Sequence, residues 1–263
     1  MARVNATKEL WLDELRVDGR AFQAVVANAD PDADVPSCPG WAVAELVHHL
    51  GSVYRWVQLH VVRGVITPPE RRLEQFTEEP PAADQLSWFD EQFSELLDTL
   101  ERLDEDLPAW NWAPAPRRAS FWQRRMAHET TLHRWDAQTA IGRVEPIPTR
   151  LATDGIAEVL DTWLPAGRRD QDREYAGLVA LEAVDAEHTW LIRLRAEGIA
   201  LLDTETIFDD DEHRPVVIAE GPASDIFLAL WGRVGFDVLE VTGDEDELAA
   251  LRVAKRRRGN GVA

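Results

Sequence analysis

The first half of the sequence contains four long segments in which apolar residues recur at helical spacing. This periodicity predicts helices over residues 7–28, 41–63, 82–103 and 121–141, with Ser120 as the N-cap of the last one. Loops rich in proline, glycine and aspartate separate the four segments. Long amphipathic helices bury their apolar faces most readily against one another, so the pattern predicts a four-helix bundle. The loops are longer than in the tightest bundles, which leaves the connectivity of the helices open.

The pattern changes after about residue 145, where two prolines mark a boundary. A predicted helix over 150–164, ended by Pro165, is followed by short β-type runs separated by polar turns. The predicted strands are 177–184, 189–196, 199–202, 215–219 and 237–242, and further helices are expected over 222–234 and 244–253. We therefore predict two domains, residues 1–145 and 146–263, of which the second is a small α+β domain.

The charge of the chain limits its partners. The formal net charge is −20, which repels nucleic acid and anionic membranes, so neither is an expected partner. The basic run at 255–258 is too small to offset this charge and is interpreted as a solvated end. No apolar run approaches the ~20 residues that span a bilayer, and the N-terminus lacks the apolar core of a signal peptide. These features predict a cytoplasmic protein.

Cysteine and tryptophan content add two expectations. Cys38 is the single cysteine, which excludes an internal disulfide and a zinc site built from several thiolates. Its position before a predicted helix could make it reactive, but a small buried side chain is the favoured interpretation. The 11 tryptophans could wall a pocket, although core packing is the more common role of such residues.

Helical phase separates the seven histidines. In segment 41–63, His49 falls in phase with the apolar stripe and is expected to face the core, whereas His48 is nearer the rim. His60 also lies near the core phase, close to the end of that helix. His188 and His213 fall in predicted turns, where solvated histidines are expected.

The fourth segment carries a polar pair on its core-facing seam, which consists of Trp122, Met126, Glu129, His133, Asp136 and Ala140. Glu129 and His133 are four residues apart, so their Cβ atoms are ~6 Å apart on one helix face. A buried carboxylate is costly unless it is paired or bound to metal. Together with His49 they give a His2Glu set with an open fourth position, as in catalytic zinc sites. A metal-free, hydrogen-bonded Glu–His pair explains the spacing equally well.

Four segments resemble a known family. Residues 35–51 (VPSCPGWAVAELVHHLG) and 125–136 (RMAHETTLHRWD) are similar to the second-helix and fourth-helix signatures of the mycothiol-dependent maleylpyruvate isomerase family. Residues 221–233 (GPASDIFLALWGR) and 239–243 (LEVTG) are similar to its second domain. The resemblance covers nearly the whole chain and implies a DinB-like four-helix bundle joined to an α+β domain related to sterol-carrier folds.

The resemblance also implies a chemistry. It implies a divalent metal, usually zinc (Zn2+), held by His49, Glu129 and His133, with mycothiol, an actinobacterial thiol, as thiolate at the open position. In the isomerase the thiolate adds to a cis double bond, the resulting single bond rotates, and elimination gives the trans isomer. Arg233 matches, loosely, an arginine that would bind substrate carboxylates.

The expected function is therefore a mycothiol-dependent isomerase or thiol S-transferase that acts on a small electrophile. The net charge argues mildly against a dianionic substrate. Two other classes stay open, a non-catalytic protein that binds metal or a small ligand, and a metal-dependent hydrolase with His128 or Asp136 as its base. The HExxH motif of metalloproteases is excluded, because Leu132 stands where its second histidine would be. A monomer and a homodimer are equally compatible with the sequence.

Overall fold

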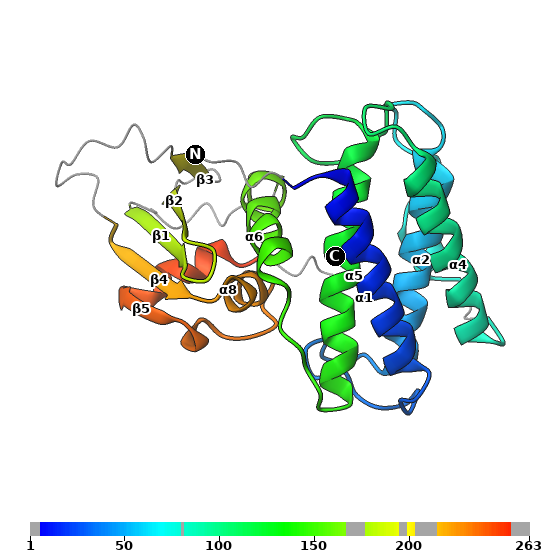
Figure 1. Cartoon of the computed structure of the whole chain (residues 1–263), viewed down its shortest axis with the longest axis horizontal. Helices are drawn as coiled ribbons and strands as arrows, with labels where there is room; N and C mark the ends of the chain where they lie inside the picture. The colour runs from blue at the N-terminus through cyan, green and yellow to red at the C-terminus, as the bar shows by residue number, and fades with distance from the viewer. Residues whose placement is uncertain (1–5, 80–81, 167–176, 195–198, 203–214, 254–263) are drawn as a thin grey trace. The chain divides into compact units, whose positions relative to one another are not determined.

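The computed structural model describes residues 6–79, 82–166, 177–194, 199–202 and 215–253. These residues divide into two compact units, 6–145 and 146–253 (Figure 1). The first unit contains the helices α1 (Lys8–Val26), α2 (Val43–Val61), α3 (Glu74–Thr77), α4 (Gln85–Arg102) and α5 (Ala119–Ala140). Each of the four long helices was predicted from periodicity, and the one-turn helix α3 was not.

The first unit is a four-helix bundle whose neighbours are not consecutive in sequence. The most extensive contacts join α1 to α5 and α2 to α4, and these pairs lie side by side in Figure 1. Further contacts join α2 to α5 and α1 to α4, so α1 and α2 lie diagonally across the bundle. This arrangement resolves the open connectivity and places α5 against both α1 and α2.

Local sequence sets the helix starts. The side chain of Thr7 accepts a hydrogen bond from the backbone N–H of Leu10 at the start of α1, and Asp84 accepts one from Ser87 at the start of α4. The prediction that Ser120 caps α5 was wrong, because this helix begins at Ala119. The backbone N–H groups of Ala119 and Ser120 donate hydrogen bonds to carbonyl groups of the preceding loop. These carbonyls satisfy the first N–H groups of the helix in place of a capping side chain.

The second unit is a mixed α+β fold. Its sheet has the strand order β3-β2-β1-β4-β5, in which only the β1–β4 pair is parallel among the described strands. The strands are β1 (Gly177–Ala183), β2 (His188–Leu194), β3 (Ile199–Leu202), β4 (Val217–Gly221) and β5 (Glu240–Gly243). Helix α8 (Ala223–Leu230) contacts β1 and β4 and packs against α6 (Thr149–Glu158). The predicted α+β class is therefore confirmed.

Two local predictions in this unit, for Pro165 and His188, were wrong. Pro165 does not end the helix after α6, because a π-helical turn, η1 (Val159–Trp163), carries the chain into α7 (Leu164–Ala166). Leu164 donates to the carbonyl of Val159, five residues back, and this wider register accommodates the proline. His188 lies at the start of β2 and packs on Trp190, rather than in a turn.

The segment predicted as a helix over 244–253 is the 3-10 helix η5 (Glu245–Leu251), and another 3-10 turn, η4 (Phe236–Val238), precedes β5.

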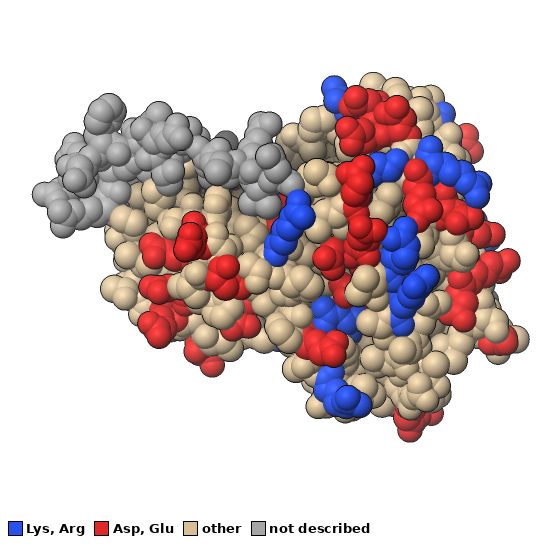
Figure 2. Space-filling view, in the orientation of Figure 1, with Lys and Arg blue, Asp and Glu red and all other residues tan. Residues whose placement is uncertain are grey.

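None of the described helices combines the length and the apolarity that crossing a bilayer requires. Acidic side chains are scattered over the face shown in Figure 2, with basic side chains among them on the helical unit.

Candidate metal centre

Helix α5 supplies most of the candidate site. Nearly every side chain from Trp122 to Gln138 is buried, including polar groups on all sides of the helix. The predicted seam is thus buried as expected from Trp122 to Asp136, whereas Ala140 is half-buried. A helix buried all round must satisfy its polar groups within the protein. The polar residues of α5 are therefore organised by specific partners.

The structure brings His49, Glu129 and His133 together. Oε1 of Glu129 lies 3.5 Å from Nε2 of His49 and 3.3 Å from Nε2 of His133. All three ligand atoms lie within 4.8 Å of one another. Ligands bonded tetrahedrally at about 2.0–2.1 Å stand about 3.3 Å apart, which is close to the observed spacing.

The chemistry of the donors also fits a divalent ion. Two imidazole nitrogens and one carboxylate oxygen form a donor set typical of catalytic zinc. Oε1 of Glu129 is buried and accepts no well-formed hydrogen bond from the described residues. A buried carboxylate oxygen without such a bond is costly unless a cation binds it. The residues present therefore fit the group that the sequence led us to expect.

Arg125 holds the other oxygen of the same carboxylate. Its Nη2 donates to Oε2 of Glu129 at 2.7 Å, and the two side chains are 0% and 2% exposed. Burial would raise the pKa of Glu129, but the charge of the Arg125 guanidinium and the polar contacts with His133 and His49 outweigh this effect. The pKa of Glu129 therefore lies well below its usual range, and the carboxylate is ionised.

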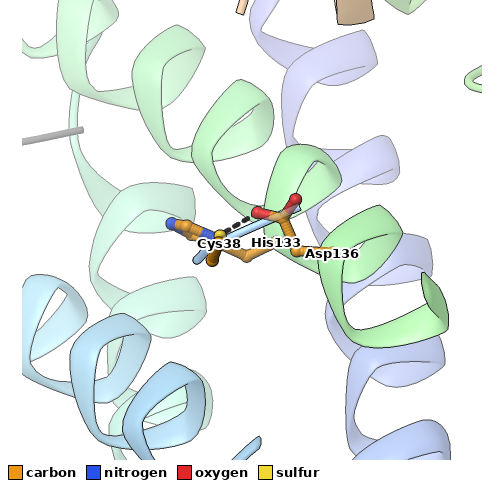
Figure 3. Close-up of side chains that lie close together, drawn as sticks. All are labelled: Cys38, His133 and Asp136. Atoms are coloured by element: carbon orange, nitrogen blue, oxygen red, sulfur yellow. Dashed lines mark hydrogen bonds and ion pairs between the residues drawn. The ribbon is translucent and has the colours of Figure 1, made fainter. Parts of the chain in front are cut away.

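Asp136 orients His133. Nδ1 of His133 donates to Oδ2 of Asp136 at 2.9 Å, the contact drawn as a dashed line in Figure 3. Burial would lower the pKa of His133, but its hydrogen bond to Asp136 and the nearby carboxylate of Glu129 outweigh that effect and raise the pKa. The bond at Nδ1 leaves Nε2 directed at Glu129, and this carboxylate–histidine arrangement is typical of metal ligands.

Cys38 lies beside this pair. Its sulfur, a nitrogen of His133 and an oxygen of Asp136 lie within 4.8 Å of one another (Figure 3). Cys38 is half-buried rather than fully buried, so its expected role as a core side chain is only partly met. It precedes Trp41, whose ring is tilted against that of His49 and stacked on that of His133, at centroid distances of 4.8 and 6.4 Å. The loop before α2 therefore forms one wall of the site.

The neighbouring histidines lie elsewhere. Nε2 of His48 is 3.2 Å from the carbonyl oxygen of Thr77, and its ring lies beside Trp88. His60 is buried at the far end of α2 among Trp56, Trp110 and Trp122, as its phase predicted. The indoles of Trp56 and Trp122 are buried in the core of the bundle, and that of Trp110 is half-buried. His213 and the basic run at 255–258 lie outside the described residues.

Arg233 belongs to the second unit. It follows α8, where its Nη1 donates to the carbonyl of Trp231 at 3.3 Å and its guanidinium lies 5.8 Å from the centre of that indole. Its role as a carboxylate-binding residue stays a prediction.

Of the two residues considered as a general base, His128 is fully buried, and Asp136 is hydrogen-bonded to His133.

Sequence reasoning missed two residues of the site. Arg125 precedes Glu129 by four residues, and this i,i+4 spacing of opposite charges could have indicated the ion pair. Trp41 carries no periodic signal, because it precedes the helix and reaches the site from a loop.

Comparison with known proteins identifies the class and then the family. The fold and the donor set define a two-domain protein with a DinB-like helical bundle and a mixed α+β domain. Residues 12–138 match the family profile described as mycothiol maleylpyruvate isomerase N-terminal domain, and residues 150–250 match the MDMPI C-terminal domain. The chain therefore belongs to the mycothiol-dependent maleylpyruvate isomerase family.

Solved structures agree with this fold. The crystal structure of the mycothiol-dependent maleylpyruvate isomerase is similar, with a TM-score of 0.61 and 15% identity over 92% of this chain and 96% of that one. A mutant of that enzyme, with one histidine replaced by alanine, gives the same TM-score, identity and coverage. The comparison with curated protein sequences gave no match. At this identity the structural likeness supports the fold.

Proposed function

We propose that the bundle binds a divalent metal ion through His49, Glu129 and His133, and that the chain is a mycothiol-dependent isomerase or thiol S-transferase. The observation that carries the proposal is the position of Oε1 of Glu129, 3.5 and 3.3 Å from the two Nε2 atoms. The solved structure to which the fold is similar is that of a mycothiol-dependent isomerase. Zinc is the expected ion, because two imidazoles and a carboxylate suit it.

The metal, when bound, lowers the pKa of a coordinating thiol, which is then present as the nucleophilic thiolate at neutral pH. The residues of the chain prepare the site for that cosubstrate. Asp136 fixes His133 with Nε2 directed inward, and Arg125 occupies one oxygen of Glu129. Trp41 covers the two histidines with an apolar ring and limits the access of water.

The substrate is a small electrophile. Addition of the thiolate to a cis double bond gives a single bond that can rotate, and elimination of the same thiolate then gives the trans isomer. Transfer without elimination gives a thioether conjugate instead. Arg233 is proposed to pair with a carboxylate of the substrate, since a guanidinium binds carboxylates in a bidentate manner.

Metal content and thiol binding test the proposal together. The protein is purified without chelator, its metal is quantified by mass spectrometry, and mycothiol is titrated by calorimetry. We expect about one metal ion per chain, and the loss of metal and of thiol binding in His133→Ala. His48→Ala is the matched control, because His48 adjoins His49 but contacts Thr77 and Trp88 instead.

The other outcomes separate the alternatives. Metal without thiol binding would overturn the thiol chemistry and favour a hydrolase or a metal-binding protein. A purified protein that takes up no divalent metal would mean that Glu129 and His133 form a structural pair. A screen of cis-alkenoic acids and simple epoxides with mycothiol then decides between isomerisation and conjugation.

The role of Arg233 has a separate test. Arg233→Gln should raise KM for an electrophile that bears a carboxylate and leave KM for an uncharged one unchanged. Arg252→Gln is the control, because Arg252 is an exposed arginine of the same unit that stacks on Phe236. Equal effects of Arg233→Gln on both electrophiles would rule out carboxylate recognition.

A further inference from the structure

Two buried arginines of α5 form ion pairs, and the pairs differ in what they join. Nε of Arg134 donates to Oδ1 of Asp18 at 3.2 Å, and Asp18 lies on α1. Arg125 instead pairs with Glu129 on its own helix, four residues away. The first pair links two helices of the bundle. The second joins two side chains of the same helix, one of which is the proposed ligand Glu129.

The cost of the second pair is nevertheless high. The side chain of Arg125 is 0% exposed and that of Glu129 is 2% exposed. Removing two charged side chains from water costs several kcal/mol each. A protein with apolar side chains of similar volume in their place is often as stable or more stable. The pair also fixes one oxygen of the Glu129 carboxylate, and this contact bears directly on the proposed metal site.

The contacts of Glu129 show that effect. Oε2 accepts the hydrogen bond from Arg125, and Oε1 faces His49 and His133. The guanidinium is charged at every accessible pH, so it does not release Oε2 by losing a proton. We propose that Arg125 is a positioning residue that restricts Glu129 to ligation through one oxygen, and thereby keeps a coordination position of the metal centre open for the thiol. This inference rests on the proposed function.

The charge of the pair leads to the same conclusion. Arg125 offsets the charge of Glu129, and neutral imidazoles add none, so the remaining charge beside the proposed ligands is that of Asp136. A divalent ion held there keeps a net positive charge for an anionic ligand such as a thiolate. This local balance matters in a chain with a net charge of −20, where an anionic ligand otherwise meets repulsion.

Substitution by Co2+ reports the number of ligands, because four-coordinate Co2+ absorbs visible light more strongly than ions with five or six ligands. The full-length protein is loaded with Co2+ and titrated with mycothiol. The wild type should give the intense spectrum of a four-coordinate ion. In Arg125→Met, Oε2 is released, so we expect a weaker absorption and a thiol affinity about 10- to 100-fold lower.

Arg134→Met is the matched control. It removes a second buried arginine from the same helix, so it should lower stability while the Co2+ spectrum and the thiol affinity stay those of the wild type. If Arg125→Met does not fold, Arg125→Gln, which keeps a polar side chain but removes the charge and shortens the reach, is measured by the same two readouts. It should show the same changes, reduced in size.

Wild-type absorption and thiol affinity in the variant that folds would overturn the inference and leave the proposed metal function standing. A wild-type protein that takes up no Co2+ would overturn the metal function and the inference with it. Equal losses in Arg125→Met and Arg134→Met would mean that Arg125 acts through stability alone, which also rejects the positioning role.

Discussion

His133 donates a hydrogen bond from Nδ1 to Oδ2 of Asp136 at 2.9 Å, and both side chains are at most 3% exposed. The bond sets the tautomer of the ring, because the carboxylate requires a proton on Nδ1 and leaves the lone pair on Nε2. Nε2 lies 3.3 Å from Oε1 of Glu129, so an ion held between them could be shared by the imidazole and the carboxylate. Asp136 therefore organises a proposed ligand without being one.

The first prediction concerns this bond. Asp136→Asn keeps the size of the side chain but weakens the hold on the His133 tautomer. We expect the affinity for Zn2+ to fall about 10- to 100-fold, as is usual when the partner of a histidine ligand is lost. A competition titration against a chromogenic chelator measures it. Asp98→Asn, at an exposed position on α4, is the control, and equal affinities of all three proteins would refute the role of Asp136.

Much of the bundle was predictable because the apolar spacing in each long helix reflects burial directly. The site was predictable for the same reason at Glu129 and His133, which share a helix, and at His49, whose phase set it apart from His48. Helical periodicity could not reveal Trp41, because a residue in a loop follows no repeating pattern. The π-helical turn before Pro165 was equally hidden, since the proline signals a helix end unless the register widens. The diagonal placement of α1 and α2 depends on tertiary packing that no single helix encodes.

The second prediction concerns the ion pair between α1 and α5. Asp18 and Arg134 are 4% and 2% exposed, so each compensates the other in a region with little water. Asp18→Asn removes one charge and leaves the buried guanidinium uncompensated. We expect the free energy of unfolding to fall by about 3 kcal/mol, measured by urea denaturation.

The control for this pair is Asp13→Asn, because Asp13 forms an exposed i,i+3 pair with Arg16 on the same helix, where a change of well under about 1 kcal/mol is expected. Similar losses in the two variants would contradict the assigned difference between the buried and exposed pairs. Metal binding should be unaffected in both.

The third prediction concerns His60. Burial lowers its pKa from 6.5 to about 4, although the hydrogen bond from Nδ1 to the carbonyl of Trp56 opposes this, and the charge of Arg63 adds to the lowering. The unfolded chain binds the proton near pH 6.5 while the folded chain does not, so stability is lost as the pH falls from 6.5 toward 4. Between about pH 7 and about pH 5 this loss amounts to about 2 kcal/mol.

His60→Phe should remove that part of the pH dependence. Its own stability at neutral pH is not the readout, since the comparison is between the slopes of unfolding free energy against pH. Urea titrations at several pH values supply these slopes. An unchanged slope in His60→Phe would show that the pKa of His60 is the same in the folded and unfolded chains.

The fourth prediction concerns a close approach in the second unit. Gly155 of α6 faces the ring of Phe227 on α8, and a Cβ at position 155 would lie 2.6 Å from a ring carbon. Alanine favours a helix over glycine by about 1 kcal/mol, but overpacking costs about 1–3 kcal/mol, and the ring of Phe227 is fully buried. Gly155→Ala should therefore destabilise the second unit despite its better helix propensity. Phe227→Leu makes room, so in the double variant Gly155→Ala should become neutral or stabilising. The double-mutant cycle, measured by thermal unfolding, isolates this coupling, and additive effects of the two substitutions would disprove the contact between α6 and α8 as its cause.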